Sequence, residues 1–273
     1  MSASPSRLVV VTVVKDDIEG FERTCASIST QSRHVEHLII DGGSAPPMLE
    51  CARKWAAELG SVLISEPDRG TYDAMNKALD QLNGHDRVWF LNAGDVFASP
   101  EAYAYVDERS SADNFTWGFG PVRVMEINGR LRHIPKQAPY SRRNYAYGRT
   151  PICHQAAVCR VRDLRAVGGF DERYSIRADY RALLLLSQIS EPVHWDMPTV
   201  EYHAGGISDR FLLRGHWQEH RVRREILGRG PVESARSLGY VSKMALRITT
   251  GRSIDALARR GIVDTDWRSR RGQ

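Results

Sequence analysis

Short apolar runs alternate along the chain with stretches in which apolar residues recur every three or four positions. Four such runs stand at 8–14, 35–40, 61–64 and 87–91. They lack strict alternation with polar residues, which is typical of strands buried on both faces of a sheet. Three stretches with helical spacing separate them, beginning near Ile18, Pro46 and Tyr72. This order, with short connections, predicts an α/β fold whose mostly parallel central sheet carries helices on both faces.

An aspartate follows each of the four predicted strands. The segments are Lys15–Asp17, Asp41–Ser44, Ser65–Gly70 and Asn92–Asp95. In open α/β sheets, ligands bind outside the carboxyl ends of the strands, so all four segments would border one crevice. Each segment alone is an ordinary turn sequence. Together they gather like charges at one edge, which costs stability unless a cation or a donor-rich ligand offsets it, so we interpret Asp95 as functional.

Two common nucleotide-binding motifs are missing from the sequence. There is no G-x-x-x-x-G-K-[ST] segment, which excludes a P-loop, and no G-x-G-x-x-G follows the first strand, which leaves a dinucleotide site unsupported. The composition, 42% hydrophobic and 26% charged residues, is that of a soluble globular protein of one large or two small domains.

The compartment is predicted from three further features. No apolar run approaches the length of a membrane span, and the first seven residues predict a short lead rather than a signal peptide. The four cysteines show no C-x-x-C pair or metal spacing, so we expect buried thiols in a reducing cytoplasm.

Positive charge is concentrated at the C-terminal end. Residues 205–273 contain 15 Lys and Arg against 7 Asp and Glu, a net charge of +8, whereas the preceding 204 residues carry −3. Apolar and basic side chains interleave there: Phe211, Leu212, Trp217, Val222, Ile226 and Leu227 with Arg210, Arg214, Arg221, Arg223 and Arg224. A basic amphipathic helix of this kind suits an anionic membrane surface. Packing against the rest of the chain or in a homodimer is the rival interpretation, and we expect no nucleic-acid partner.

Several segments resemble the successive motifs of the family 2 glycosyltransferases, in particular the bacterial members that build cell-surface polysaccharides and glycolipids. They are VVTVVKD ending at Asp16, IIDGGS (39–44), SEPDRGTYDAMNKAL (65–79), FLNAGD (90–95), the stretch 151–184 and YHAGGIS (202–208). The resemblance covers about residues 7–208. It implies a GT-A fold, a nucleotide-diphosphate sugar such as a UDP- or GDP-sugar, a divalent metal (Mn²⁺ or Mg²⁺), and inverting transfer to a glycan or lipid-linked acceptor.

The resemblance also implies the division of the chain. Residues 1–208 would be the GT-A catalytic domain, with a nucleotide-sugar-binding half at about 7–97 and an acceptor-binding half at about 98–208. Residues 209–273 would be a basic helical extension. The enzyme would be cytoplasmic, and peripheral at the inner face of the plasma membrane if the extension binds lipid.

Roles on the donor side follow from the family pattern. The resemblance assigns nucleotide binding to Thr12, Val14, Asp16, Asp41, Asp68, Arg69, Asn76, Lys77, Asn92 and Ala93. Among them, Asp41 would accept from a base N–H and Arg69 would lie near the phosphates. Asp95 would hold the metal, with His203 as a further ligand or a diphosphate contact. Most relatives have an aspartate where this chain has Asn92, and one charge fewer holds a divalent cation less firmly.

The acceptor side would contain the catalytic base. Asp179 stands where the family has this residue, at the start of a helix predicted at 180–189; a helix cap is the alternative, because aspartate often caps helices. The pattern assigns His154, Gln155 and Arg177 to the acceptor. Residues 122–134 predict a hairpin that turns at Asn128-Gly129, and 136–150 predict a mobile loop over the active site.

Two other functions are compatible with parts of the sequence. A non-catalytic nucleotide-sugar-binding protein would lack Asp95 or Asp179, and both are present. A membrane- or anion-binding module is favoured by the basic C-terminal segment alone.

Overall fold

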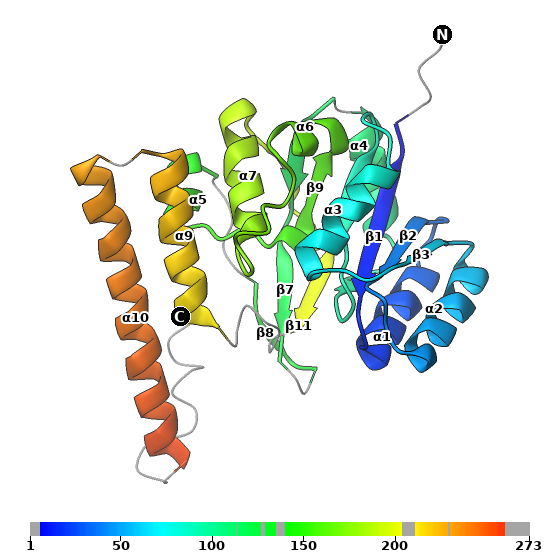
Figure 1. Ribbon diagram of the computed structural model, residues 1–273, viewed down its shortest axis with the longest axis horizontal. Helices are drawn as coiled ribbons and strands as arrows, with labels where there is room; N and C mark the ends of the chain where they lie inside the picture. The colour runs from blue at the N-terminus through cyan, green and yellow to red at the C-terminus, as the bar shows by residue number, and fades with distance from the viewer. Residues whose placement is uncertain are drawn as a thin grey trace. The chain divides into compact units, whose positions relative to one another are not determined.

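The computed structural model describes residues 6–112, 114–126, 129–134, 140–203, 211–228 and 230–259 (Figure 1). The chain forms two compact units, Met1–Gly206 and Ile207–Gln273. The domain boundary predicted at residue 208 falls within 204–210, which lie outside the described residues.

Seven strands form the central sheet of the first unit, in the order β10-β6-β9-β4-β1-β2-β3. They are β1 (Leu8–Val14), β2 (Glu36–Asp41), β3 (Val62–Ser65), β4 (Arg87–Phe90), β6 (Trp117–Phe119), β9 (Ala157–Arg160) and β10 (Val193–His194). β1 to β4 are parallel, β10 is parallel to β6, and β9 runs antiparallel between β4 and β6. The predicted fold class, including its first four strands, is confirmed.

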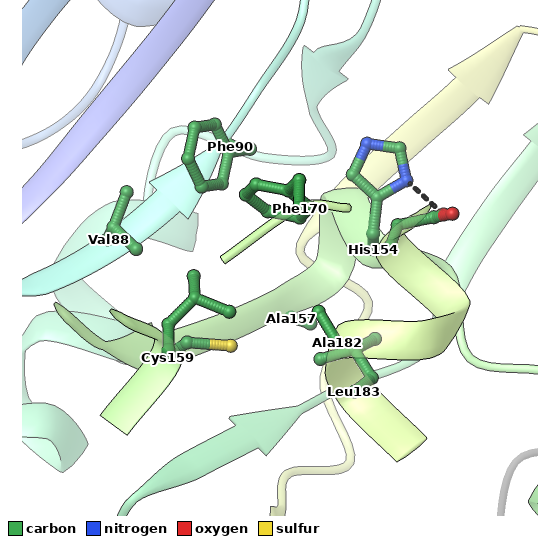
Figure 2. A pocket seen from close by; sticks show the side chains of 10 residues that line it. Val88, Phe90, His154, Ala157, Cys159, Phe170, Ala182 and Leu183 are labelled. Carbon is green, nitrogen blue, oxygen red and sulfur yellow. Dashed lines mark ion pairs between the residues drawn. The ribbon is translucent and has the colours of Figure 1, made fainter. Parts of the chain in front are cut away.

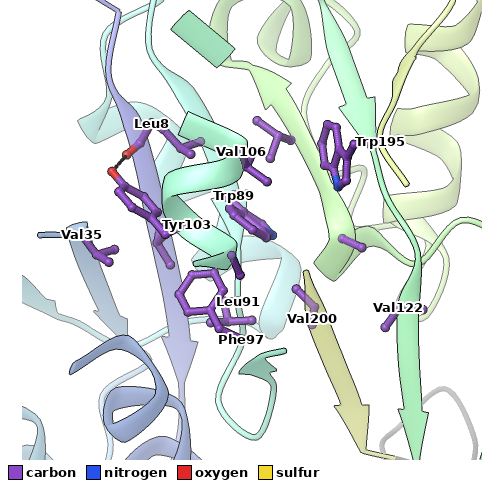
Figure 3. Close-up of a cluster of buried hydrophobic side chains, with 14 of the residues drawn as sticks. Leu8, Val35, Trp89, Leu91, Phe97, Tyr103, Val106, Val122, Trp195 and Val200 are labelled. Carbon is purple, nitrogen blue, oxygen red and sulfur yellow. Dashed lines mark hydrogen bonds between the residues drawn. The ribbon is translucent and has the colours of Figure 1, made fainter. Parts of the chain in front are cut away.

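Helices cover both faces of this sheet, as predicted. The first unit contains α1 (Ile18–Ser29), α2 (Pro46–Leu59), α3 (Thr71–Gln81), α4 (Ala102–Ala112), α5 (Arg142–Ala146), the 3₁₀ turn η1 (His154–Ala156), α6 (Val161–Ala166) and α7 (Ala178–Ile189). Trp89 points to the face that α4 covers, where it joins a large apolar cluster (Figure 3). Its neighbours Val88 and Phe90 point to the other face, toward α6 and α7. Burial on both faces explains the apolar runs of β1, β2 and β4. The same prediction is wrong for β3, which lies at the edge of the sheet and is only partly buried, with Val62 60% exposed.

A second sheet of four strands lies in the same unit, in the order β5-β11-β7-β8. The strands are β5 (Val96–Phe97), β7 (Val122–Met125), β8 (Leu131–His133) and β11 (Val200–His203). β7 and β8 pair antiparallel, which confirms the predicted hairpin; of its predicted turn, Gly129 has a φ of +77° and Asn128 lies outside the described residues.

The prediction of a loop at 136–150 is wrong for the centre of this segment, where α5 forms. Ser141 caps this helix: its Oγ accepts a hydrogen bond from the backbone N–H of Asn144. The Tyr180 hydroxyl donates to the carbonyl of Ala146 over 2.7 Å, which ties α5 to α7. Residues 136–139 lie outside the described part of the chain.

The second unit contains α9 (Leu212–Ile226) and α10 (Pro231–Arg259), which lie side by side in Figure 1. Polar groups join them: the guanidinium of Arg223 donates to Ser237 Oγ over 2.7 Å and stacks on the ring of Tyr240. Arg223, expected on a basic face, is therefore buried. Among the described helices, none combines the length and apolar character that a membrane crossing requires.

Candidate active site

The end of β4 and the beginning of β9 meet at one edge of the central sheet. Because β9 is antiparallel to β4, with Trp89 opposite Val158, the residues before β9 adjoin the residues after β4. His154 and Gln155 therefore lie beside the segment Asn92–Asp95. The sequence predicted a crevice at the carboxyl ends of the parallel strands. Because β9 is antiparallel, its N-terminal end lies at the same edge of the sheet.

Asp41, at the end of β2, is fully buried and has one unsatisfied oxygen. Its Oδ2 accepts from the hydroxyl of Ser65 over 2.6 Å and from the backbone N–H of Ser44 over 3.2 Å. Its Oδ1 is buried and has no hydrogen-bond partner in the part of the chain that the structure describes. A buried acceptor without a donor is costly, so Asp41 fits a ligand that brings an N–H group.

The loops after β1, β2 and β3 are joined around Asp41. Asp16, with a φ of +52°, accepts from the backbone N–H of Ala45 over 2.8 Å, and its own N–H donates to Ser44 Oγ. The carboxylate of Asp68 packs so closely over Gly42 that a Cβ there would overlap it. Asp16 and Asp68 thus shape the predicted nucleotide crevice by holding its loops together.

Two of the predicted nucleotide-binding side chains are engaged inside the fold instead. The hydroxyl of Thr12 donates to the carbonyl of Leu91 over 2.9 Å and lies 3.0 Å from the ring of His37. The amide of Asn76 binds both the N–H and the carbonyl of Phe170. Val14, also assigned to the nucleotide, is buried at the end of β1 and accepts from Gly42 N–H through its carbonyl.

The two cations among the predicted nucleotide-binding residues, Arg69 and Lys77, lie on or next to α3 and already have carboxylate partners. Arg69, three quarters exposed, pairs with Asp73 at 2.6 Å and with Glu172 at 2.9 Å. Lys77 pairs with Glu66 at 3.0 Å and donates to the carbonyl of Pro67. A phosphate group would therefore compete with these carboxylates for both cations.

The turn after β4 buries a carboxylate. Thr24 holds this turn, because its hydroxyl donates to the carbonyl of Asp95 and accepts from the N–H of Gly94. Ala93 fixes the turn to β1 through its N–H, which donates to the carbonyl of Val13. Burial raises the pKa of Asp95 to about 7, against the lowering effects of the charge of His154 and a hydrogen bond from the Gln155 side chain.

His203 ends β11, whose pairing directs it toward this turn. β11 runs antiparallel to β5, with Val200 opposite Phe97 and Glu201 opposite Val96, so its end points back along the chain toward Asp95. Within the described ranges, no three His, Cys, Asp or Glu side chains form a group that could hold a metal ion. A cation at Asp95 would thus need ligands from a substrate or solvent.

Asp179 lies in the first turn of α7, and both of its oxygens receive hydrogen bonds. Tyr72 donates its hydroxyl to Oδ1 over 2.8 Å, and His154 Nδ1 lies 3.0 Å from Oδ2. Burial tends to raise the pKa of this carboxyl, but the hydrogen bond and charge of His154 outweigh it, aided by the charge of Arg177 and by Tyr72, and lower the pKa to about 2. Arg177, not Asp179, is the N-cap residue of α7, so the helix-cap interpretation is wrong.

His154 connects Asp179 to the turn after β4. Its second ring nitrogen, Nε2, lies 3.3 Å from the amide nitrogen of Asn92. The ring and Asp179 border an otherwise apolar cavity, with room for about one water molecule, between β4, β9, Phe170 and α7 (Figure 2). Tyr72 is a site residue that the sequence does not single out, because its position fits the apolar stripe of the third predicted helix. The available signal is its hydroxyl, which needs a partner when buried.

The chain is similar in sequence to bacterial glycosyltransferases. No protein-family model matches the chain. An uncharacterized glycosyltransferase of Mycobacterium tuberculosis is 30% identical over 213 residues, which cover 76% of this chain and 78% of that protein. A PGL/p-HBAD biosynthesis glycosyltransferase of Mycobacterium bovis BCG is 29% identical over 153 residues, 53% of this chain and 55% of that protein.

Two solved structures are similar in fold. A mannosyltransferase of Pyrobaculum calidifontis, in complex with GDP-Man and Mn²⁺, aligns with a TM-score of 0.62 at 15% identity, covering 94% of this chain and 78% of that one. S. aureus TarS 1-349, in complex with UDP-GlcNAc, aligns with a TM-score of 0.61 at 14% identity, covering 87% of this chain and 71% of that one. At these identities the likeness concerns the fold.

Proposed function

Because the chain belongs to the glycosyltransferases, we propose that it is an inverting, family 2 enzyme that transfers a sugar from a nucleotide-diphosphate sugar to a hydroxyl group. The acceptor is a glycan or a lipid-linked molecule of cell-envelope polysaccharide or glycolipid synthesis. One observation carries the proposal: a polarised Asp179–His154 pair lies beside the buried Asp95 turn at one edge of the sheet. The neighbouring structures with GDP-Man and UDP-GlcNAc support a nucleotide-sugar donor.

The reaction needs the two chemical functions that this edge combines. An acceptor hydroxyl is a poor nucleophile, so a base must take its proton as it attacks, and Asp179, which is paired with His154, is that base. The leaving diphosphate gains negative charge, which must be stabilised. Asp41 would accept from an N–H of the base, through the buried Oδ1 that has no partner among the described residues.

Asp95 fits a divalent cation that takes its other ligands from phosphate. Burial disfavours the ionised form of this carboxyl, and a cation would restore it. A single protein carboxylate is common for cations bound together with a nucleotide. We propose that Asp95, with His203, holds Mn²⁺ or Mg²⁺. When bound, such a cation acts as a Lewis acid on the leaving diphosphate.

We also propose where the enzyme acts. The net charge of +8 in residues 205–273 supports peripheral contact with the anionic inner face of the plasma membrane, from the cytoplasm. A lipid-linked acceptor would be presented there.

A donor screen tests the proposed function. The full chain is incubated with Mn²⁺ or Mg²⁺ and a panel of UDP- and GDP-sugars, and slow hydrolysis and thermal stabilisation are measured. We expect one donor class to stabilise the fold and to be hydrolysed, and Asp95→Asn to lose hydrolysis and metal-dependent stabilisation. Asp196→Asn, at a fully exposed carboxylate, is the matched control and should behave as wild type.

Three outcomes of the screen would contradict the proposal in different ways. Stabilisation without hydrolysis or transfer would favour the non-catalytic nucleotide-sugar-binding protein. Full activity in EDTA would remove the metal from the mechanism. No response to any donor would reject the function.

A further inference from the structure

The carboxylate of Asp179 is held by side chains from two distant parts of the chain. Tyr72, in the first turn of α3, donates its hydroxyl to Oδ1 over 2.8 Å. His154 Nδ1, in η1, lies 3.0 Å from Oδ2. An ionised carboxylate can accept about four hydrogen bonds, so each oxygen keeps an electron pair that an acceptor hydroxyl can approach.

The side chain of an aspartate does not by itself fix the plane of its carboxylate. The torsion at its last bond has broad minima, so rotation redirects every electron pair at small energetic cost. A base must lie within hydrogen-bond reach of the proton that it takes, and a misplacement of about 1 Å can lower a rate about 100-fold. The two hydrogen bonds to Asp179 restrict this rotation.

Tyr72 is itself fixed by the packing around Phe170. Its ring stacks on Phe170, with ring centroids 5.8 Å apart and an interplanar angle of 17°. Phe170 packs edge-on against Phe90, and the amide of Asn76 binds both the backbone N–H and the carbonyl of Phe170. Tyr72 and Asn76 are one helical turn apart, so they lie on the same face of α3. This face of α3 therefore holds both the loop before α7 and the carboxylate at the start of α7.

The hydroxyl of Tyr72 keeps its hydrogen. Burial, the negative charge of Asp179 and the hydrogen bond between them raise the pKa of Tyr72 well above its ordinary value. A neutral phenol always has a hydrogen to donate, and its bond to an ionised carboxylate is stronger than one between neutral groups. The hydroxyl can therefore orient Asp179 but does not itself act as the base.

We propose that Tyr72 is a positioning residue for the transfer reaction: its hydroxyl orients the carboxylate of Asp179 so that a free electron pair faces the acceptor hydroxyl. The inference rests on the proposed function, in which Asp179 is the base. As the acceptor oxygen bonds to the anomeric carbon, its proton moves to the Asp179 carboxylate. The bond from that carbon to the diphosphate oxygen breaks, and its electron pair leaves with the diphosphate. Tyr72 exchanges no proton in this step.

Steady-state hydrolysis of the nucleotide sugar found in the donor screen tests the assignment, with water as the acceptor. Tyr72→Phe removes the hydroxyl and keeps the stacked ring. We expect kcat to fall by about 10- to 100-fold, because a misplaced base loses much of the rate that a base contributes. The KM and the calorimetric Kd of the donor should stay within about twofold of wild type, since Tyr72 acts through Asp179.

Tyr103→Phe is the matched control. The Tyr103 hydroxyl donates to the carbonyl of Leu8 over 2.7 Å, in the apolar cluster on the other face of the central sheet (Figure 3). This variant loses the same group and a hydrogen bond of the same kind. We expect it to be less stable to heat but to keep the wild-type kcat and KM.

A double-mutant cycle with Asp179→Asn separates positioning from general support of the fold. Asp179→Asn should itself lower kcat at least about 100-fold. In that background, Tyr72→Phe should change the remaining rate by less than about twofold, because there is no base left to orient. Equal losses in both backgrounds, a wild-type kcat in Tyr72→Phe, or a loss confined to donor binding would each overturn the inference. Failure of the wild-type chain to hydrolyse any donor would instead reject the proposed function.

A second measurement does not need turnover. In the proton NMR spectrum of the full chain, we expect a downfield hydroxyl resonance that is absent in Tyr72→Phe and retained in Tyr103→Phe. It should move upfield in Asp179→Asn, because an amide oxygen is a weaker acceptor than a carboxylate. A resonance that Asp179→Asn leaves unchanged, or no resonance assignable to Tyr72, would show that this hydroxyl does not orient the carboxylate.

Discussion

At the scale of single residues, Asp41 offers the clearest sign of a ligand, because its buried Oδ1 has no hydrogen-bond donor among the described residues. Asp41→Asn keeps the shape of the side chain but replaces an acceptor oxygen with an N–H₂ group that cannot accept. We expect binding of the nucleoside diphosphate to weaken by about 1–3 kcal/mol, the usual cost of an unpaired buried group. Titration calorimetry of the free nucleotide measures this.

A truncated ligand provides the control for Asp41. Ribose 5-diphosphate has no base, so wild type and Asp41→Asn should bind it equally. If Asp41→Asn binds both ligands more weakly by the same factor, Asp41 contacts the ribose or supports the loops, and the base binds elsewhere.

A second residue-scale prediction concerns stability and His37. Its ring joins β2 to its neighbours through Ser61 Oγ at 2.8 Å and Thr12 Oγ1 at 3.0 Å, and burial lowers its pKa to about 3. The unfolded chain takes up a proton near pH 6.5, whereas the folded ring does not until about pH 3. His37 therefore stabilises the fold above pH 6.5, and that stability is lost as the pH falls from 6.5 toward 3.

Urea unfolding at a series of pH values checks this prediction. Wild type should lose up to about 1.4 kcal/mol per pH unit over this window from the one proton. His37→Gln should be less stable at pH 7 and lose less on acidification, while His85→Gln should keep the wild-type slope. Equal slopes in wild type and His37→Gln would show that the ring is protonated in the folded state.

The sequence predicted residue types at the site better than their contacts. Asp41 and Asp95 lie at the ends of buried strands and Asp179 lies at the start of a helix, as predicted, because strand ends and helix starts can be placed from apolar patterns. Thr12 and Asn76 are also assigned to the nucleotide, but their side chains make hydrogen bonds to the backbone of the protein. Which polar group meets another depends on packing between distant segments, such as Tyr72 with Asp179, and no local pattern contains that information.

At the scale of elements, regular strands were predictable and short ones were not. β1 to β4 each contain at least three consecutive apolar residues, whereas β5 and β10 contain two residues each, too few to show any period. β9 has an apolar sequence like the others, but its direction depends on the route of the chain before it. That direction decides the site, because it brings His154 to the end of β4.

The basic helix α9 is the element for which a partner can be tested. Its exposed residues include Arg214, Trp217, Arg221 and Arg224. Each basic residue near an anionic bilayer contributes about 1 kcal/mol, so replacing the three arginines by glutamine should weaken binding to phosphatidylglycerol vesicles by roughly 100-fold. Sedimentation with vesicles measures this, and wild-type binding should disappear in high salt.

The matched control removes the same charge from the first unit. Arg23→Gln, Arg53→Gln and Lys54→Gln together should leave vesicle binding unchanged, since these exposed cations lie on α1 and α2. Equal losses in both triple variants would mean that net charge, and not α9, attracts the vesicle. Binding to RNA without binding to vesicles would identify a different partner.

At the scale of the whole molecule, the central sheet joins segments that are far apart in sequence. β1 pairs with β4, and β4 pairs with β9. Apolar periodicity predicts the layers of such a fold, because every buried strand must be covered on both faces. It cannot predict which strand pairs with β4 on the side away from β1, since a strand of the same apolar sequence could also pair at the other edge of the sheet.

This strand order has a consequence during synthesis. β4 leaves the ribosome about 70 residues before β9, and at about 5–20 residues per second it waits roughly 4 to 14 seconds for its partner. Throughout that interval Val88, Trp89 and Phe90 form an open apolar edge, which other nascent chains can pair with. Any shortened chain that stops before β9 keeps this edge permanently. The donor-binding half is therefore unsuitable as a stand-alone module for transplantation into another enzyme, and a usable fragment must extend past Arg160.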